Sequence, residues 1–494
     1  MMSETNRRKF LGAAAGAAAF TIIPRHALGG PGYVPPSDKI TLAHIGTGTE
    51  GLREIFNLLA APEIRIVAVC DPNRDATGYR DFGRDSLLRD IREALKKPDW
   101  RPGGEGAVPG GREVGRNVVD TFYGDQSCKA YADFRELFAK ETDIDAVKIM
   151  TPDHLHGVIA TAAMKRGKHV IVHKPISNRL AEARRVIETA RAKGVATHFM
   201  PWDSNGSMEQ VMTWIRGGEI GTLREVHNWS ARPMWPQYAL LPRDNPPVPE
   251  GFDWDLWLGP EKERPYHPDY THMVFRGWYD FGGGSMADMG HYSLWTVFNA
   301  LELAGPTAVE PMLSHQCAMD GPFAYTVRND YSFPIASVVR FKYPARGSRG
   351  PVDLVWYDGG MKPVTPAGVD ELEPEGMMFT GDKGVILGGF RVENPRILGK
   401  PAPPPPPADR RHHDLGELSP GLKQWVAACR GGAQSPGCFL NAGPITEAVN
   451  LYSAALRAGR RIVFDAAAGR ITNIDDANRY LVREYRKGWS PEEV

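Results

Sequence analysis

The sequence GTGTEG, which begins at Gly46, has the residue types and the spacing that bind the pyrophosphate of a dinucleotide. Gly46 permits a tight turn, Gly48 lets the backbone approach a pyrophosphate, and Gly51 lets a helix pack closely on a strand. Asp71 lies twenty residues beyond the last of these glycines, where a carboxylate can accept hydrogen bonds from the adenosine ribose. Together with Thr47, these residues predict a dinucleotide-binding site.

The neighbouring segments predict how this site is positioned. Residues 39–45 predict a buried strand that ends at the glycine-rich loop, residues 52–60 a helix, and residues 64–70 a second strand that ends at Asp71. Free N–H groups at the start of the helix favour phosphate binding. The carboxylate favours NAD over NADP because it would repel a 2′-phosphate, although Arg74 leaves room for NADP.

Further along the chain, predicted strands alternate with predicted helices, which indicates a parallel sheet with helical crossovers. Two of these strands, at residues 146–150 and 169–172, end in polar clusters. Ligands of such sheets bind at the carboxyl ends of the strands, so we expect both clusters to lie beside the cofactor. Residues 78–126 interrupt the alternation with a polar, glycine- and proline-rich stretch, which we expect to be a surface insertion. The cofactor-binding candidates in the two clusters are Thr151, Pro152, His154, His173 and Lys174.

The composition indicates a small-molecule substrate. The 494 residues include 59 basic and 59 acidic side chains, so the chain has no basic field for nucleic acid or an anionic membrane. Its five cysteines are odd in number and form no CxxC pair, which argues against a zinc site and a disulfide framework. We therefore expect no metal site.

The first residues resemble a twin-arginine export signal. Arg7 and Arg8 precede an apolar run at residues 11–23, which is too short to span a bilayer and is closed by Pro24. We expect residues 1–29 to be a signal peptide, no stable membrane anchor, and a periplasmic or extracellular protein that meets the export machinery. The alternative is a disordered basic terminus. Because this pathway moves folded proteins, the cofactor would be loaded before export and retained.

The motifs as a set resemble the Gfo/Idh/MocA oxidoreductases, named for glucose–fructose oxidoreductase and inositol dehydrogenase, and most closely their secreted bacterial subgroup with twin-arginine signals. The resemblance runs from about residue 39 to residue 485. It is carried by the glycine-rich loop with Asp71, residues 151–156 (TPDHLH), Lys174-Pro175, residues 254–260 (WDLWLGP) and residues 282–291 (GGGSMADMGH).

This resemblance implies an α/β fold with two domains. A Rossmann NAD(P)-binding domain would occupy residues 38–176, and an α/β domain with a large, open, mainly antiparallel sheet would occupy residues 177–485. The second domain would bind substrate and mediate oligomerisation, so the family implies a homo-oligomer. Members of the family oxidise or reduce hydroxyl groups of sugars and cyclitols with NAD(P).

The same resemblance supplies candidate catalytic residues. Lys174 resembles the family lysine that polarises the reacting hydroxyl, and Asp288 lies in the glycine-rich motif of the second domain. Two departures matter. His173 stands where the family usually has glutamate, and Tyr292 stands where it has the catalytic histidine, with His291 one residue earlier. On a regular helix from Ser285 both would lie near Asp288, so either can be the proton-transfer group.

We therefore predict an NAD-dependent oxidoreductase that acts on a sugar, a glycoside or a cyclitol and recycles a tightly bound cofactor. An aromatic-rich region at residues 229–279 suits carbohydrate, although its aromatic side chains can equally pack on one another. Two alternatives stay open. One is a redox-neutral lyase or hydrolase that oxidises a glycoside only transiently, and the other is a non-catalytic sugar-binding protein.

Overall fold

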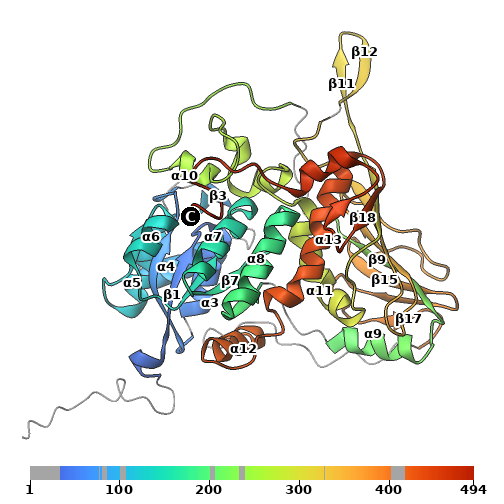
Figure 1. The fold of residues 1–494 in the computed structure, drawn as a ribbon, viewed down its shortest axis with the longest axis horizontal. Coiled ribbons are helices and arrows are strands. Elements are labelled where there is room, and N and C mark those ends of the chain that lie inside the picture. Colours follow the sequence, from blue (N-terminus) through green and yellow to red (C-terminus); the bar gives the residue numbers. More distant parts are fainter. Residues whose placement is uncertain are drawn as a thin grey trace, which may run out of the picture.

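The structure, a computed structural model, describes residues 34–59, 61–76, 78–80, 86–100, 107–108, 110–200, 206–232, 240–327, 329–401 and 418–494. Figure 1 shows two halves side by side, one built on a parallel sheet and the other on a large second sheet. This is the predicted α/β architecture. The expected signal peptide at residues 1–29 and most of the proline-rich run at residues 401–407 lie outside the described residues.

Six strands of the described chain form the parallel sheet, in the order β5-β2-β1-β6-β7-β8. The order reverses between β1 and β6, which is where a dinucleotide crosses sheets of this kind. The predicted alternation is confirmed, because α3 (Thr49–Leu59), α6 (Phe134–Lys140) and α7 (Asp153–Lys165) connect these strands. The strands are β1 (Ile40–Ile45), β2 (Ile64–Cys70), β5 (Lys129–Tyr131), β6 (Ala146–Ile149), β7 (His169–Val172) and β8 (Thr197–Phe199).

The stretch at residues 78–126 is more than a surface insertion. It contains α4 (Ser86–Leu95) and α5 (Arg112–Tyr123), and the second helix is the crossover between β2 and β5. Val114, Val118 and Val119 bury the apolar side of α5 in the core of the first domain. The prediction was wrong because the flanking glycines and prolines hid a helical repeat. Two short strands, β3 (Tyr79–Arg80) and β4 (Ala107–Val108), pair beside it.

The first domain also continues past the expected boundary at residue 176. Helix α8 (Leu180–Lys193) leads to β8, which pairs with β7 as the last strand of the parallel sheet. Helix α12 (Pro420–Cys429) then returns from far along the chain and buries Trp425 in the same core. Contacts between distant segments of this kind leave no trace in local sequence pattern.

The second sheet has nine strands among the described residues, in the order β17-β16-β15-β9-β14-β13-β10-β18-β19. It is antiparallel except for the pair β9–β14, as predicted for a mainly antiparallel sheet. A tight hairpin follows Thr380, where Gly381 N donates to Gly384 O at 2.9 Å. The strands are β9 (Leu223–Trp229), β10 (Ala308–Leu313), β13 (Ser337–Tyr343), β14 (Val352–Tyr357), β15 (Gly376–Gly381), β16 (Val385–Gly388), β17 (Arg396–Ile397), β18 (Ile462–Asp465) and β19 (Arg470–Ile471).

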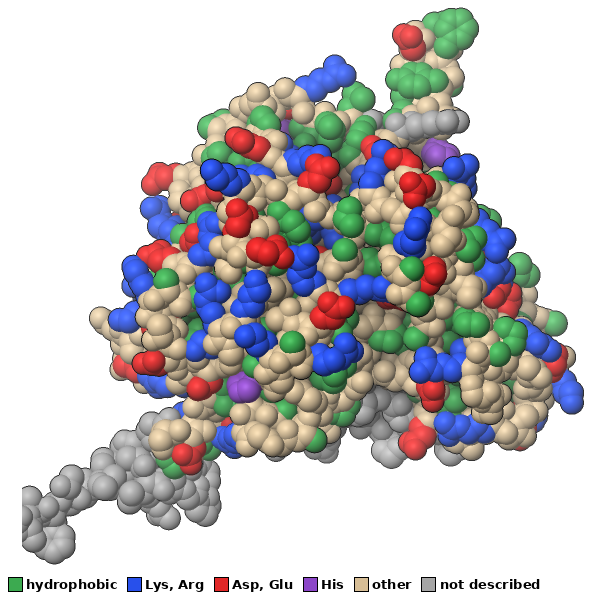
Figure 2. All heavy atoms as spheres, viewed as in Figure 1, with side chains coloured by type: hydrophobic (Ala, Val, Ile, Leu, Met, Phe, Trp, Pro, Cys, Tyr) green, Lys and Arg blue, Asp and Glu red, His purple; other side chains and the backbone are tan. Residues whose placement is uncertain are grey.

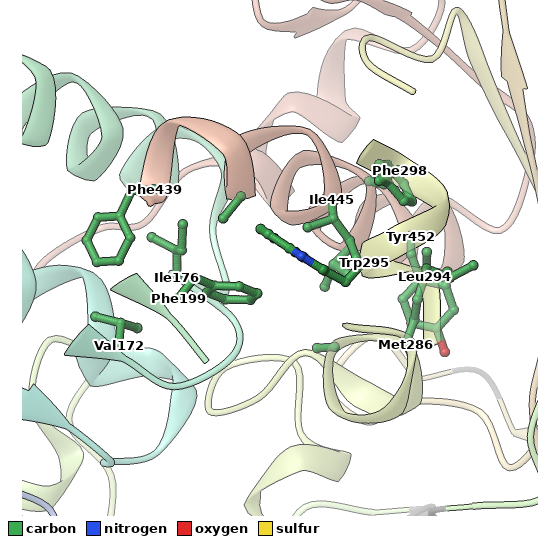
Figure 3. Packing of buried hydrophobic residues seen from close by; sticks show 14 of the residues in the cluster. Val172, Ile176, Phe199, Met286, Leu294, Trp295, Phe298, Phe439, Ile445 and Tyr452 are labelled. Carbon is green, nitrogen blue, oxygen red and sulfur yellow. The ribbon is translucent and has the colours of Figure 1, made fainter. Parts of the chain in front are cut away.

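Helices and one apolar core join the two sheets. Helix α13 (Phe439–Ala458) packs against α8 of the first domain and against β10 of the second. Figure 3 shows Phe199 from β8 beside Trp295 from α11 (His291–Ala300), and their rings lie 5.5 Å apart between centroids. This continuous packing fixes the two domains relative to each other, and therefore fixes any site between them.

Other elements decorate this body. Helix α9 (Gly206–Arg216) precedes β9, and the short α10 (Trp254–Leu258) lies near the first domain. The hairpin β11–β12 (Gln316–Asp320, Phe323–Val327) stands away from the body in Figure 1. On the face that Figure 2 shows, acidic and basic side chains are interspersed. Within the described ranges, no helix is long and apolar enough to cross a membrane, and no cluster of three or more histidine, cysteine or acidic side chains has the arrangement of a metal site.

Candidate cofactor and proton-transfer site

A cavity that is open to solvent lies at the carboxyl end of the parallel sheet. The first domain contributes the glycine-rich loop, Asp71, Thr151, Pro152 and His173 to its wall. The second domain contributes Phe252, Trp257, Thr271, His272, Phe275 and Arg276. The cavity therefore lies between the domains, at the predicted position.

The glycine-rich loop has no room for side chains at two of its three glycines. A Cβ on Gly46 would lie 2.5 Å from the carbonyl of Met150, and the residue has a φ of +98°. A Cβ on Gly51 would lie 2.1 Å from Gly46 O, because α3 packs directly on the loop. Gly48 lines the cavity, so its backbone is open to a ligand on that side. Glycine is thus required where the sequence predicts it.

Asp71 holds the loop from the end of β2. Its carboxylate accepts hydrogen bonds from Thr47 N at 2.7 Å and from Asn73 N at 2.8 Å. Thr47 Oγ1 also lies 3.2 Å from it, so Thr47 supports the loop and does not line the cavity. Burial raises the pKa of Asp71, although these hydrogen bonds oppose the rise. Asp71 still lines the cavity, and a carboxylate has lone pairs left for ribose hydroxyls.

A segment of the second domain closes over this end of the cavity. Arg74 N donates to Gly251 O at 2.8 Å, and Asp253 N donates to Pro72 O at 3.1 Å. Between these two hydrogen bonds, Asn73 and Phe252 pair as an isolated antiparallel β-bridge. We call residues 250–253 the clasp. It pairs with the chain just after β2, so it covers the region where the adenosine would lie.

The residues present fit a dinucleotide. Thr151 Oγ1 lines the cavity, is buried, and has no hydrogen-bond partner among the described residues. Pro152 and His173 line the same wall. The start of α3 faces the cavity through Thr49 and Glu50, where a helix presents free N–H groups. A buried hydroxyl without a partner and a cradle of glycines are what a bound dinucleotide would complete.

His154 is not part of this wall. Its Nε2 lies 2.8 Å from Trp257 O, and its ring packs against Trp257 and Phe281. Burial lowers its pKa to about 3. His154 therefore joins α7 to α10 beneath the cavity, and its predicted contact with the cofactor is not seen. The neighbouring His156 joins Thr151 O to Pro175 O, at 2.8 and 2.6 Å, which holds the ends of β6 and β7 together.

Lys174 and Asp288 form a buried ion pair between the two domains. Arg276 Nε lies 3.9 Å from Asp288 Oδ1 and 3.6 Å from Asp153 Oδ1, so the pair continues into a network. Burial and then the Arg276 charge lower the pKa of Lys174. Burial alone would raise the pKa of Asp288, but Lys174 and Arg276 outweigh it and hold the pKa below its usual value.

Tyr292 completes this group. Its hydroxyl lies 3.1 Å from His173 Nε2, and Lys174 Nζ lies 5.3 Å from the centre of its ring. Burial, together with the charges of Lys174 and Arg276, lowers the pKa of His173 far below its usual value, so this histidine is neutral near pH 7. The group Lys174–Asp288–Tyr292–His173 thus lies next to the end of the cavity that His173 and Arg276 line.

The side chain of His291 points into the core, away from the Lys174–Asp288 pair. Its Nδ1 lies 2.6 Å from Ala287 O, its ring packs 5.1 Å from that of Phe199, and its burial is complete. Burial lowers its pKa to about 3. The regular helix predicted from Ser285 is instead a π-helical turn (Met286–Gly290) followed by α11. A π-turn widens the helix by one residue per turn, which directs Tyr292 towards Lys174 and His291 into the core.

The aromatic-rich region mostly packs on itself. Trp254 stacks on Trp257 with centroids 5.0 Å apart, and Tyr270 packs edge-on against Trp278 at 4.9 Å. Trp235 and Tyr238, two of the aromatic residues in the predicted sugar-binding region, lie outside the described residues. Trp254, Trp257, Tyr270 and Trp278 form a cluster beside the cavity wall rather than an open sugar platform, whereas Trp229 and Tyr279 pack elsewhere in the core. Sequence reasoning missed Tyr79, which covers Gly48, because it lies in the stretch expected to be a surface insertion.

Two family models match this chain. One, described as an oxidoreductase family with an NAD-binding Rossmann fold, matches residues 114–200, and the other, its C-terminal alpha/beta domain, matches residues 222–310. The matched segments include Thr151 and His173 on one side of the cavity and the lining residues 252–276 on the other, whereas the glycine-rich loop and Asp71 precede them. Residues 114–200 and 222–310 therefore match the two domains of the Gfo/Idh/MocA family of oxidoreductases. This confirms the resemblance that the motifs carry, while membership of a secreted subgroup stays a prediction.

Individual relatives match over shorter segments. Levoglucosan dehydrogenase of Pseudarthrobacter phenanthrenivorans is 30% identical over 112 residues, which are 21% of this chain and 28% of that protein. A glycosyl hydrolase family 109 protein of Solibacter usitatus is 28% identical over 158 residues, 32% of this chain and 29% of that protein. The chain thus matches less than a third of the length of these relatives.

Solved structures match over most of the chain. Aldose-aldose oxidoreductase from Caulobacter crescentus, complexed with glycerol, has a TM-score of 0.51 at 17% identity, and the match covers 86% of this chain and 100% of that one. This similarity establishes a shared fold.

Proposed function

We propose that the protein is an NAD-dependent oxidoreductase that acts on a hydroxyl group of a sugar, a glycoside or a cyclitol. One observation carries the proposal: the dinucleotide cavity ends beside a buried cluster of proton-transfer groups, Lys174, Asp288 and Tyr292. The name of the levoglucosan dehydrogenase relative supports a sugar-derived substrate. Asp71 supports NAD as the cofactor.

Bound NAD would supply the hydride acceptor. The chain itself must then bind the substrate hydroxyl and exchange its proton. Lys174 is buried and its pKa is lowered, so it can bind the hydroxyl oxygen and share its proton readily. Asp288 orients this ammonium and stabilises its charge. Tyr292 lies over the same ammonium and is the second group able to exchange the proton.

We further propose that NAD is retained as a prosthetic group. The clasp closes the adenosine end of the cavity with backbone hydrogen bonds from Arg74 and Asp253, and such a cover slows dissociation. A retained cofactor needs a reaction that restores it within one cycle. This agrees with the expectation of twin-arginine export to the periplasm or the medium, which remains our proposal on the strength of residues 1–29.

One experiment tests both statements. The full chain is purified without added nucleotide, denatured, and the supernatant assayed for NAD(H). We expect about one NAD(H) per chain, and a stoichiometric change in the absorbance of reduced nicotinamide when the native protein meets one active sugar, glycoside or cyclitol without a second substrate that would restore the cofactor. Absence of nucleotide would contradict retention. Absence of any absorbance change over a broad panel, with nucleotide bound, would contradict net oxidation.

A redox-neutral glycoside lyase or hydrolase is the second candidate. The similarity to a glycosyl hydrolase family 109 protein favours it specifically, because that similarity covers 32% of this chain. Release of a chromogenic leaving group from a synthetic glycoside, without net change in nicotinamide absorbance, would support this candidate over the first. For a non-catalytic sugar-binding protein, neither signal would appear.

We also propose a homo-oligomer. The large second sheet is the surface through which the family resemblance predicts self-association. Sedimentation of the purified chain, or light scattering after size exclusion, would test this by giving the mass of the particle directly.

A further inference from the structure

The ring of Tyr292 is placed near two cations from different parts of the chain. Lys174 Nζ, just after β7, lies 5.3 Å from the ring centre, and the guanidinium carbon of Arg391 lies 4.8 Å from it. Both distances are within the ~6 Å over which a cation is attracted to an aromatic face. Arg391 belongs to the turn between β16 and β17, far in sequence from every motif that predicts the site.

The turn that carries Arg391 is tightly built. Gly389 N donates to Glu393 O at 2.8 Å, and Arg391 N donates to Glu393 Oε2 at 2.7 Å. Asn228 Nδ2, buried on β9, lies 3.3 Å from Phe390 O and anchors the turn to the sheet. These bonds fix where the Arg391 side chain begins.

Val392 makes this turn unusual. It is fully buried and has a φ of +65°, in the left-handed region that β-branched residues rarely adopt. Backbone strain of this kind persists only when the surrounding structure enforces it, and it is concentrated at functional sites. Arg391 immediately precedes the strained Val392, and the turn places the Arg391 guanidinium over the ring of Tyr292.

The charges around Tyr292 come from every element packed against it. Burial raises the pKa of its hydroxyl, and the acidic neighbours raise it further, whereas Arg391 acts in the opposite direction. Removal of Arg391 would therefore leave the phenol harder to ionise. The groups that face it are His173 and Lys174 after β7, Asp288 in the π-turn, Glu50 and Glu54 on α3, Arg276 from the second domain, and Arg391.

We propose that Arg391 is a positioning residue that holds Tyr292 against His173 and stabilises negative charge on the Tyr292 oxygen during proton transfer. The proposal rests on the proposed oxidoreductase function. In alcohol oxidation the Tyr292 phenol would pass its proton to the neutral His173 as it takes the proton of the substrate hydroxyl, and bound NAD would accept the hydride from the carbon that bears this hydroxyl. The substrate becomes a carbonyl compound, and the reverse step returns both.

The test compares Arg391→Gln with Arg391→Lys and with Arg396→Gln, a matched control at an exposed position of β17 in the same hairpin. For the best substrate of the panel, the pH profile of kcat/KM is measured on full-length protein with bound NAD. We expect Arg391→Gln to move the rising limb of the pH profile for oxidation to higher pH by about one unit. At neutral pH kcat/KM would then fall about tenfold, and at alkaline pH it would return to the wild-type value. Arg391→Lys should keep most of the wild-type kcat/KM at neutral pH, and Arg396→Gln should leave the pH profile unchanged.

A second readout does not depend on turnover. Ultraviolet titration of each protein minus its Tyr292→Phe counterpart isolates the ionisation of this one phenol, and it should move to higher pH in Arg391→Gln. An unchanged profile and titration in Arg391→Gln would overturn the proposal, as would a uniform loss at all pH values with a raised KM. Wild-type protein that binds NAD but oxidises no substrate would instead contradict the proposed function. The titration would still show whether Arg391 affects the ionisation of Tyr292.

Discussion

Lys174 and Asp288 meet across the junction of the two domains, as a buried ion pair. Lys174 lies just after β7 of the dinucleotide-binding sheet, whereas Asp288 lies in the π-turn that precedes α11. Because the lysine belongs to the cofactor domain and the carboxylate to the second domain, the pair forms only when both domains are packed together. A shared core around Phe199 and Trp295 provides that packing (Figure 3). The proposed catalytic pair therefore forms only at the domain interface.

Replacement of Lys174 by methionine should abolish turnover while the cofactor stays bound. The change removes the ammonium that binds the substrate hydroxyl, and losses of general acid–base groups are of the order of 10²–10⁴-fold in rate. Asp288→Asn should reduce the turnover rate less than Lys174→Met, because the Lys174 ammonium remains. NAD(H) content after denaturation serves as the control, and full turnover by Lys174→Met would contradict the assigned role.

Tyr292→Phe and His291→Leu should separate the two candidate proton-transfer residues. Tyr292→Phe removes only the hydroxyl that lies 3.1 Å from His173, so we expect a large fall in kcat with nearly unchanged thermal stability. His291→Leu alters a core side chain packed on Phe199, so we expect altered stability and a normal KM. Thermal melts measured beside steady-state kinetics would distinguish them, and the reverse assignment would require the opposite pattern.

The clasp makes a prediction about cofactor retention. Gly251 has a φ of +77°, and a Cβ there would lie 3.2 Å from the Arg74 side chain, so Gly251→Val should push the clasp away from β2. Faster loss of NAD(H) on repeated desalting is the expected result. Glu250→Gln is the matched control, because its ion pair with Arg74 is exposed and contributes little. Equal retention in both variants would mean that the clasp does not hold the cofactor.

The cofactor half of the site was predictable from the sequence because its chemistry is local. Gly46, Gly51 and Asp71 lie within one strand–helix–strand unit, and each acts through its own backbone or through the next element. The direction of His291 was not predictable, because a π-turn and a regular helix share the same apolar pattern. Arg391 was also missed, since a turn far along the chain brings it to Tyr292 and no motif marks it.

Buried histidines predict how stability depends on pH. His291 is one of seven among the described residues, and for all of them burial is the largest cause of a lowered pKa: His44, His154, His156, His173, His198, His227 and His291. A histidine with a folded-state pKa below its unfolded value of 6.5 binds more protons when unfolded. The contribution of such a histidine to the free energy of unfolding is complete above pH 6.5. It is lost as the pH falls towards the folded-state pKa, which is about 3 for His291.

His291→Leu isolates one of these contributions. Relative to this variant, wild-type protein should lose about 1.4 kcal/mol of unfolding free energy per pH unit below pH 6.5 and nothing above it. Buried acids with a raised pKa, such as Asp358, act in the opposite sense but are common to both proteins and cancel in the comparison. Denaturant unfolding at a series of pH values measures the difference, with the exposed His315→Asn as control. A difference that does not change with pH would mean that His291 is protonated equally in the folded and unfolded chain.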